Sequence, residues 1–266
     1  MTRARSAAAA ALGIAVAMSA TAGCSSGGDT GAGTVTTVVT ITRSSPAPAP
    51  SSTAPSSAAT ASYQQSSTRV TGRTARATYD VTIPQLTGGK AAVTAEFNQS
   101  MRAALQDQID DDYGSGRAFT LEDGRRDGPF HIGSRVISAE QITYWMANPP
   151  GAHGDSLIAT VTIDADTAKP ITLSDAFGDL DTGLQRLSQE AARLLPTTNV
   201  GSRYERSGIT PTEKNFANWT ASPDGMAIHF SDYQVGAYAD GLITITIPWS
   251  DLSDVLAPGM QAVLSS

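Results

Sequence analysis

The chain has 266 residues and a formal net charge of −7, from 18 basic and 25 acidic residues. This acidic balance argues against nucleic acid as a partner and against binding to anionic lipid surfaces. The single cysteine excludes an intramolecular disulfide and a cysteine-based zinc site, so the folded part must be held together by its core alone.

The first 23 residues are typical of a bacterial signal peptide. Arg3 and Arg5 form a basic start, residues 7–20 are an alanine-rich apolar run, and small residues precede Cys24. The run of about 14 residues is shorter than the roughly 20 that a spanning helix needs. We therefore expect cleavage before Cys24 and lipid attachment to it. The alternative is an ordinary secretory signal, because a lipobox usually has Leu where this chain has Thr21.

Lipid attachment would place the protein at the extracytoplasmic face of the cell membrane, in the cell envelope. One acyl chain binds a membrane only marginally, so stable anchoring implies the multiply acylated bacterial form, with palmitate among its chains. The membrane is then reached through the lipid alone.

Residues 24–68 predict a disordered linker, because Ser, Thr, Ala, Gly and Pro dominate and Asp29 and Arg43 are the only charged residues there. Residues 69–266 have the size of one globular domain. Without the signal peptide the chain has 16 basic and 25 acidic residues, a net charge of −9.

The first part of the domain predicts a strand and then a helix. Apolar residues alternate at Tyr79, Val81 and Ile83, and we expect that strand to end at Pro84. A helical stripe of apolar residues with a spacing of four follows, and Gly114 is expected to end the helix after the acidic residues 110–112. The stripe consists of Val93, Phe97, Met101, Leu105 and Ile109.

The second part predicts three strands and one helix. Alternation over residues 157–163 indicates a strand, followed by a turn over residues 164–169. Residues 184–195 have a helical stripe that Pro196 ends, and residues 226–230 and 243–247 are two more strands, the last closed by Pro248. The fold class that we predict is α+β, with two amphipathic helices packed on a mostly antiparallel sheet.

Motifs that would carry chemistry are missing from the sequence. It has no nucleophile elbow, P-loop or dinucleotide fingerprint, and His131, His153 and His229 are far apart. His229 alternates with the apolar residues of its strand, so we expect it on the solvent face. The segment 164–166 resembles the start of a calcium loop but lacks the later glycine and glutamate, so we expect a simple turn. We assign no catalytic residue, metal or cofactor.

Two loops have unusual compositions. Residues 149–154 form a Pro- and Gly-rich turn that contains His153. Residues 230–241 join two predicted strands and contain Tyr233, Tyr238 and two glycines. A tyrosine in a glycine-flanked loop suits a binding surface. We expect Tyr233 to be buried in the core; for Tyr238, contact with a partner and cover of a sheet edge both stand.

Together, these segments resemble the DUF3298 domain family over roughly residues 69–266, most closely after Pro149. This chain departs from the family pattern at Ala237, where Pro is usual, and at Ala168, where Gly is frequent. The resemblance is carried by Gly151-Ala152-His153, Asp164…Lys169-Pro-Ile-Thr-Leu-Ser-Asp175-Ala-Phe177, Asn215-Phe216, Phe230…Tyr233-Gln-Val-Gly236 and Gly241.

The resemblance implies binding rather than catalysis. In this family, the extracellular domain of the anti-sigma factor RsiV recognises lysozyme through the loop before its last strand, and a secreted mycobacterial antigen is related. We expect a lipid-anchored binding module, with no signalling segment of its own, for a lysozyme-like protein or a cell-envelope component. The resemblance implies ligand-binding roles for Tyr238, Ala237, Gly236, Tyr233 and His153.

Two alternatives remain. A cell-wall hydrolase or esterase would need a Ser or Asp nucleophile within hydrogen-bond reach of His153 or His229 as the base. A structural lipoprotein without a soluble ligand would need neither such a cluster nor an exposed tyrosine loop.

Overall fold

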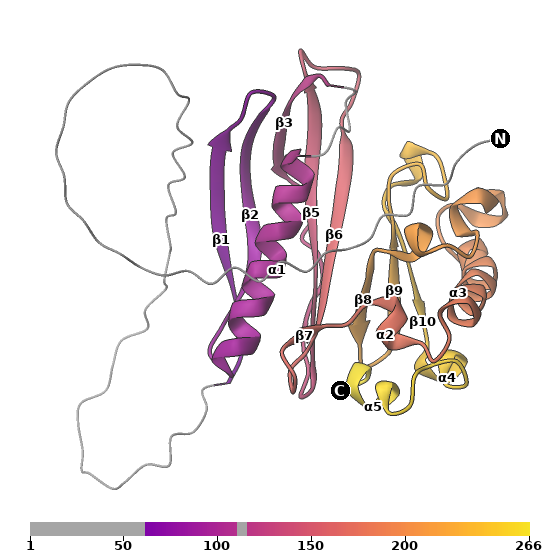
Figure 1. Ribbon diagram of the computed structural model, residues 1–266. Helices are drawn as coiled ribbons and strands as arrows, with labels where there is room; N and C mark the ends of the chain where they lie inside the picture. Colours follow the sequence, from indigo (N-terminus) through magenta and orange to yellow (C-terminus); the bar gives the residue numbers. More distant parts are fainter. Residues whose placement is uncertain (1–61, 111–115) are drawn as a thin grey trace, which may run out of the picture. The chain divides into compact units, whose positions relative to one another are not determined.

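The computed structural model describes residues 62–110 and 116–266. The predicted signal peptide, Cys24 and the linker up to residue 61 lie outside the described residues, as do Gly114 and the acidic residues 111–112. All described elements appear in Figure 1.

The first half of the described chain forms a seven-stranded sheet (Figure 1). The strand order is β1-β2-β3-β5-β6-β7, with β4 paired to β5, and every pair is antiparallel except β2 with β3. The strands are β1 (Gln64–Arg73), β2 (Ala77–Thr87), β3 (Ala118–Asp123), β4 (Phe130–Ile132), β5 (Val136–Asn148), β6 (Asp155–Asp164) and β7 (Lys169–Pro170).

The start of this sheet differs from the sequence prediction in two places. The domain boundary expected at Arg69 falls inside β1. The strand β2 continues past Pro84, where an end was predicted. Proline is tolerated there because β3 pairs only with residues 77–80 of β2. The Thr82 N–H, which points to the same side as position 84, donates instead to the Asp123 side chain at 2.6 Å.

The helix α1 (Ala91–Asp110) covers one face of this sheet, as Figure 1 shows. All five residues of its predicted stripe are buried. They divide between two apolar clusters, with Val93, Phe97 and Met101 in one and Leu105 and Ile109 in the other. The predicted stripe is therefore confirmed.

The second half of the chain forms a three-stranded antiparallel sheet of order β10-β9-β8. The helix α3 packs on one face of it, through Leu184, Leu187 and Ala191. Between α3 and β8 the chain makes a series of short 3₁₀ turns, the first of which contains Pro196. The elements are α2 (Leu173–Ala176), α3 (Leu180–Leu194), β8 (Trp219–Ser222), β9 (Gly225–Phe230), β10 (Ile243–Ile247), α4 (Trp249–Leu252) and α5 (Met260–Leu264).

The α+β prediction is confirmed, and the structure adds that the strands divide between two sheets with one long helix on each. The sequence could not separate the two sheets, because alternation shows that a strand has a buried face without showing which sheet it joins.

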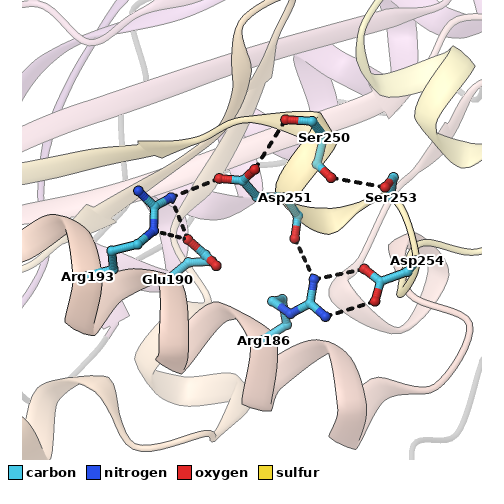
Figure 2. A network of polar contacts seen from close by, with 7 residues as sticks. All are labelled: Arg186, Glu190, Arg193, Ser250, Asp251, Ser253 and Asp254. Atoms are coloured by element: carbon cyan, nitrogen blue, oxygen red, sulfur yellow. Dashed lines mark hydrogen bonds and ion pairs between the residues drawn. The ribbon is translucent and has the colours of Figure 1, made fainter.

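Ion pairs connect the segment 250–254, which contains most of α4, to α3 (Figure 2). Arg186 binds both carboxylate oxygens of Asp254 at 2.8 Å and the Asp251 carbonyl at 2.6 Å. About two turns further along α3, Arg193 contacts Glu190 and the Asp251 carboxylate. These groups are partly exposed, so their effect on stability is modest and lies mainly in positioning α4.

The two sheets meet through polar contacts. The backbone N–H of Ala221 in β8 donates to Ser138 Oγ in β5 at 3.0 Å, and the N–H of Trp219 donates to Thr160 Oγ1 in β6 at 3.2 Å. These bonds hold the β8 edge of the small sheet against the large sheet.

The turn between β6 and β7 provides a test of backbone strain. Ala168 has φ of 59° in this turn, in the left-handed region that costs a non-glycine residue about 1–2 kcal/mol. Ala168→Gly should raise the free energy of unfolding by roughly 0.5–1 kcal/mol in urea denaturation, because relief of strain exceeds the entropy that glycine adds to the unfolded chain. Ala165→Gly is the matched control: Ala165 is buried without a positive φ and should lose stability. Equal losses in both variants would contradict the account.

Candidate functional site

The loop between β9 and β10 and the loop before β6 bring three aromatic side chains together. The rings of His153 and Tyr238 stack with centroids 4.2 Å apart and an interplanar angle of 21°. The Tyr233 ring centroid lies 5.8 Å from that of Tyr238. We call His153, Tyr233 and Tyr238 the aromatic cluster.

Hydrogen bonds fix the orientation of His153. Its Nδ1 lies 3.0 Å from the Gly154 carbonyl oxygen, which can only accept, so Nδ1 carries the hydrogen. Its Nε2 lies 3.1 Å from the Tyr233 hydroxyl oxygen. The imidazole thus links the two loops.

Tyr144 of β5 contacts both loops that carry the aromatic cluster. Its hydroxyl oxygen accepts from the Gly154 N–H at 2.8 Å and from Arg125 Nη2 at 3.1 Å, and it interacts with the Tyr238 hydroxyl. The Arg125 guanidinium also lies 4.8 Å from the centroid of the Tyr144 ring. Partial burial acts to raise the pKa of Tyr144, but the donors from Gly154, Tyr238 and Arg125 outweigh it and lower the pKa overall. The interaction with Tyr144 in turn raises the pKa of Tyr238.

Two hollows flank the aromatic cluster. One, of about 310 Å³, is lined by Asp155, Asp232, Asn218 and Tyr233 among others. The other, of about 360 Å³, is lined by Tyr238, Asp232 and Asp240 together with Arg125 and Arg126. Asp232 lies between them and accepts the Ser156 N–H at 2.7 Å.

The structure brings together three of the five ligand-binding residues predicted from the sequence, namely His153, Tyr233 and Tyr238. Ala237 is exposed nearby, and its N–H donates to Asp240 Oδ2 at 2.9 Å. Gly236 packs on Val200 so closely that a Cβ there would lie 2.4 Å from Cγ1. These two residues shape the loop.

The prediction that Tyr233 is buried is wrong. Tyr233 is 54% exposed, whereas Val235, two positions further along the chain, is 1% exposed and lies in the core. The Tyr233 backbone has φ of 64°, which turns the side chain outward. Alternation could not reveal this, because the period of two ends with β9 at Phe230.

The prediction that His229 is on the solvent face is also wrong, since it is 3% exposed. Its face of β9 packs against β5, where Glu140 is 1% exposed. His229 Nδ1 lies 3.2 Å from Glu140 Oε1 and 3.2 Å from Thr244 Oγ1, and Nε2 lies 2.8 Å from Thr220 Oγ1. Arg126 Nη1 lies 3.3 Å from Glu140 Oε2. We call Arg126, Glu140, Thr220, His229 and Thr244 the inter-sheet polar cluster.

Burial controls the charges of this cluster. It lowers the pKa of His229 to about 4, and the positive charge of Arg126 acts in the same direction. Burial raises the pKa of Glu140, although Arg126 opposes that effect. Both shifts favour neutral forms, because an uncompensated buried charge is costly. Sequence reasoning missed Glu140; the signal was a polar run inside a strand that is buried on both faces.

Other predicted features have simple outcomes. Residues 164–169 form the expected turn, closed by the Ala168 N–H donating to the Asp164 carbonyl at 2.8 Å. Within residues 62–110 and 116–266, no three His, Cys, Asp or Glu side chains are grouped so that they could hold a metal ion. No helix of that same part of the chain is long and apolar enough to cross a membrane.

Comparison with known proteins now places the fold. Residues 174–250, from α2 to the start of α4, match the family described as "Protein of unknown function (DUF3298)". The chain therefore contains a DUF3298 domain over residues 174–250. This range includes the small sheet with His229 and the loop between β9 and β10. No curated protein matches the chain.

Two solved structures resemble it. A DUF3298 family member from Bacteroides fragilis covers 77% of this chain and 98% of its own, at 15% identity and a TM-score of 0.50. A DUF3298 family protein from Pseudomonas aeruginosa covers 75% and 96%, at 13% identity and a TM-score of 0.45. At 15% identity the first likeness speaks for the fold and not for a function.

The inter-sheet polar cluster predicts opposed pH dependences. His229 has an ordinary pKa of 6.5 and a folded value of about 4, so between these values the unfolded state binds more protons and stability rises with pH. For Glu140 the folded pKa lies above the ordinary 4.5, so the folded state binds more protons and stability falls as pH rises. In the parent the two trends offset each other.

Removing one partner should expose the other trend. As pH rises from 4.5 to 6.5, the free energy of unfolding of Glu140→Gln should rise relative to that of the parent, because the falling trend of Glu140 is removed. Over the same range that of His229→Gln should fall relative to the parent, and either change is at most about 1.4 kcal/mol per pH unit. Urea denaturation at several pH values measures this, with exposed Glu213→Gln as a control that should follow the parent. Parallel profiles for all four proteins would refute the assignment.

Proposed function

We propose that this protein is a lipid-anchored extracytoplasmic binding module for a protein or a cell-envelope component. The observation that carries the proposal is the aromatic cluster, in which Tyr233 is the one exposed large hydrophobic side chain among the described residues. An exposed tyrosine held rigidly loses little conformational entropy on binding, which is why such residues are frequent hot spots.

The cluster is preorganised by its surroundings. His153 links Tyr233 to the loop before β6, and Tyr144 holds Tyr238 from β5. The hollows on either side of the cluster give a partner concave surface next to a projecting ring. These contacts tie both loops to the large sheet, so binding would require little rearrangement.

The partner class follows from charge and from the family resemblance. The chain is acidic, so a basic partner would be steered toward it. A lysozyme-like protein fits that description and is the kind of ligand that the RsiV resemblance implies.

Tyr233 is the residue that tests this proposal. Tyr233→Gly should weaken the partner complex about 30-fold, equivalent to about 2 kcal/mol, because a central anchor is removed. Stability should stay equal or rise by up to about 1 kcal/mol, because glycine relieves the positive φ. Affinity for the partner captured from envelope extract and urea denaturation measure the two effects.

Tyr204→Ala is the matched control, since it removes a half-buried tyrosine outside the cluster. It should cost some stability and leave affinity unchanged. Undiminished binding by Tyr233→Gly would refute the proposed surface.

The location is tested at Cys24. Cys24→Ala should move the processed protein from the membrane fraction to the soluble fraction, because the acyl chains provide the attachment. Fractionation in detergent-free buffer with immunoblotting measures this. If the processed variant still sediments with membranes, the anchor lies elsewhere.

A hydrolase or esterase is a second candidate, favoured by one observation. Thr220, His229 and Glu140 follow one another as hydroxyl, imidazole and carboxylate, and Thr220 and His229 line a hollow of about 370 Å³. In that reaction Thr220 Oγ1 would attack an ester carbonyl while its proton passes to His229 Nε2. The bond to the ester's alcohol would break as His229 returns the proton to that alcohol, and water would then hydrolyse the acyl-threonine. Against it, Thr244 competes with Glu140 for Nδ1 at the same distance.

Ester turnover decides this candidate. With p-nitrophenyl acetate as the probe, a hydrolase should lose turnover in Thr220→Ala and in His229→Ala and keep it in Thr246→Ala, which alters another side chain of the same hollow. A parent rate no higher than the buffer rate, or one that persists in Thr220→Ala, removes the candidate.

A further inference from the structure

We propose that the hollow beside Tyr233 receives an arginine side chain of the binding partner. The proposal rests on the proposed function and assigns a chemical group to one part of the same surface. It is carried by the pairing of an exposed aromatic ring with two carboxylates that form no ion pair with a described residue.

The carboxylates are those of Asp155, at the start of β6, and Asp232, in the loop after β9. Asp155 Oδ1 is buried and has no hydrogen-bond partner. Asp232 Oδ2 accepts one bond, from the Ser156 N–H at 2.7 Å. Neither carboxylate forms an ion pair with any other described residue.

A buried carboxylate oxygen without a donor is unfavourable, since it has given up hydration without replacing it. The described lining of this hollow consists of Asp155, Ser156, Leu157, Ile158, Asn218, Ser231, Asp232 and Tyr233, without Lys or Arg. A positive charge in this hollow would complement both acids.

The neighbouring hollow is a useful contrast. It also contains two acids, Asp232 and Asp240, but Arg125 and Arg126 line it. Arg203 further approaches Asp240 to 4.0 Å. Arginine side chains of the protein itself therefore line that side, whereas no Lys or Arg lines the side next to Tyr233.

Tyr233 selects the kind of cation. Its ring forms a wall of the hollow, exposed and held by a backbone with φ of 64°. Strain of this kind in a non-glycine residue is typical of functional sites. A planar guanidinium can stack on a tyrosine ring while its N–H groups bind a carboxylate, which an ammonium group cannot do in the same way.

The test uses the full-length protein and a defined probe, Nα-acetyl-L-arginine methylamide, titrated at constant ionic strength. The backbone amide of Ser156 reports occupancy by NMR, because it donates to Asp232. We expect saturable shifts with the arginine probe, shifts at least threefold weaker with the lysine probe, and none with the uncharged citrulline probe. Asp155→Asn and Tyr233→Gly should each reduce binding at least fivefold, and the control Asp224→Asn, at an exposed turn, should not.

Several outcomes would overturn the proposal: no saturable shift, equal binding of citrulline, or unchanged binding by Asp155→Asn. These outcomes differ from failure of the proposed function. If Tyr233→Gly loses the captured partner while Asp155→Asn binds both partner and arginine probe as the parent does, the binding surface stands and the arginine subsite falls.

Discussion

The polar contact between the two sheets is the constraint on which the rest of the molecule depends. Most of the apolar surface of each sheet is buried by its own helix, so the sheets meet through groups that must find specific partners. Ser138 and Thr160 accept backbone N–H groups of β8, and His229 of β9 lies against Glu140 of β5. Hydrogen bonds are directional, so this contact sets one register between the sheets where an apolar contact would tolerate sliding.

That register places the candidate site. The loop with Tyr233 and Tyr238 follows β9, and the loop with His153 joins β5 to β6. His229 of β9, four residues before Tyr233, lies 3.2 Å from Glu140 of β5. At the surface His153 stacks on Tyr238, and the hydroxyls of Tyr238 and Tyr144 interact. The inter-sheet polar cluster thus positions the aromatic cluster.

The two clusters suit different roles because water reaches them differently. Glu140, Thr220 and His229 are almost fully buried, and burial shifts the pKa values of Glu140 and His229 so that their neutral forms are favoured. Beside the aromatic cluster, Asp155 and Asp232 line an open hollow without forming an ion pair with a described residue. Carboxylates that line an open hollow can meet a ligand, whereas side chains enclosed between two sheets mainly hold the structure together.

The sequence by itself determined the local elements and the surface loops. Periodicity placed α1, α3, β6, β9 and β10, because one buried face imposes a period of 3.6 or 2 on apolar residues. Composition singled out the loops with His153, Tyr233 and Tyr238, because glycine and tyrosine in short loops are distinctive.

Only the tertiary structure decided which faces were covered and which loops met. His229 and Tyr233 show the reason. A strand's alternation separates two faces but does not tell whether a second sheet covers the polar one, so His229 was expected in water and is buried against Glu140. Beyond the end of a strand, alternation no longer applies, and the positive φ of Tyr233 turned outward a ring that was expected in the core. The site combines residues about 80 positions apart, and their meeting depends on long-range sheet pairing that no local pattern encodes.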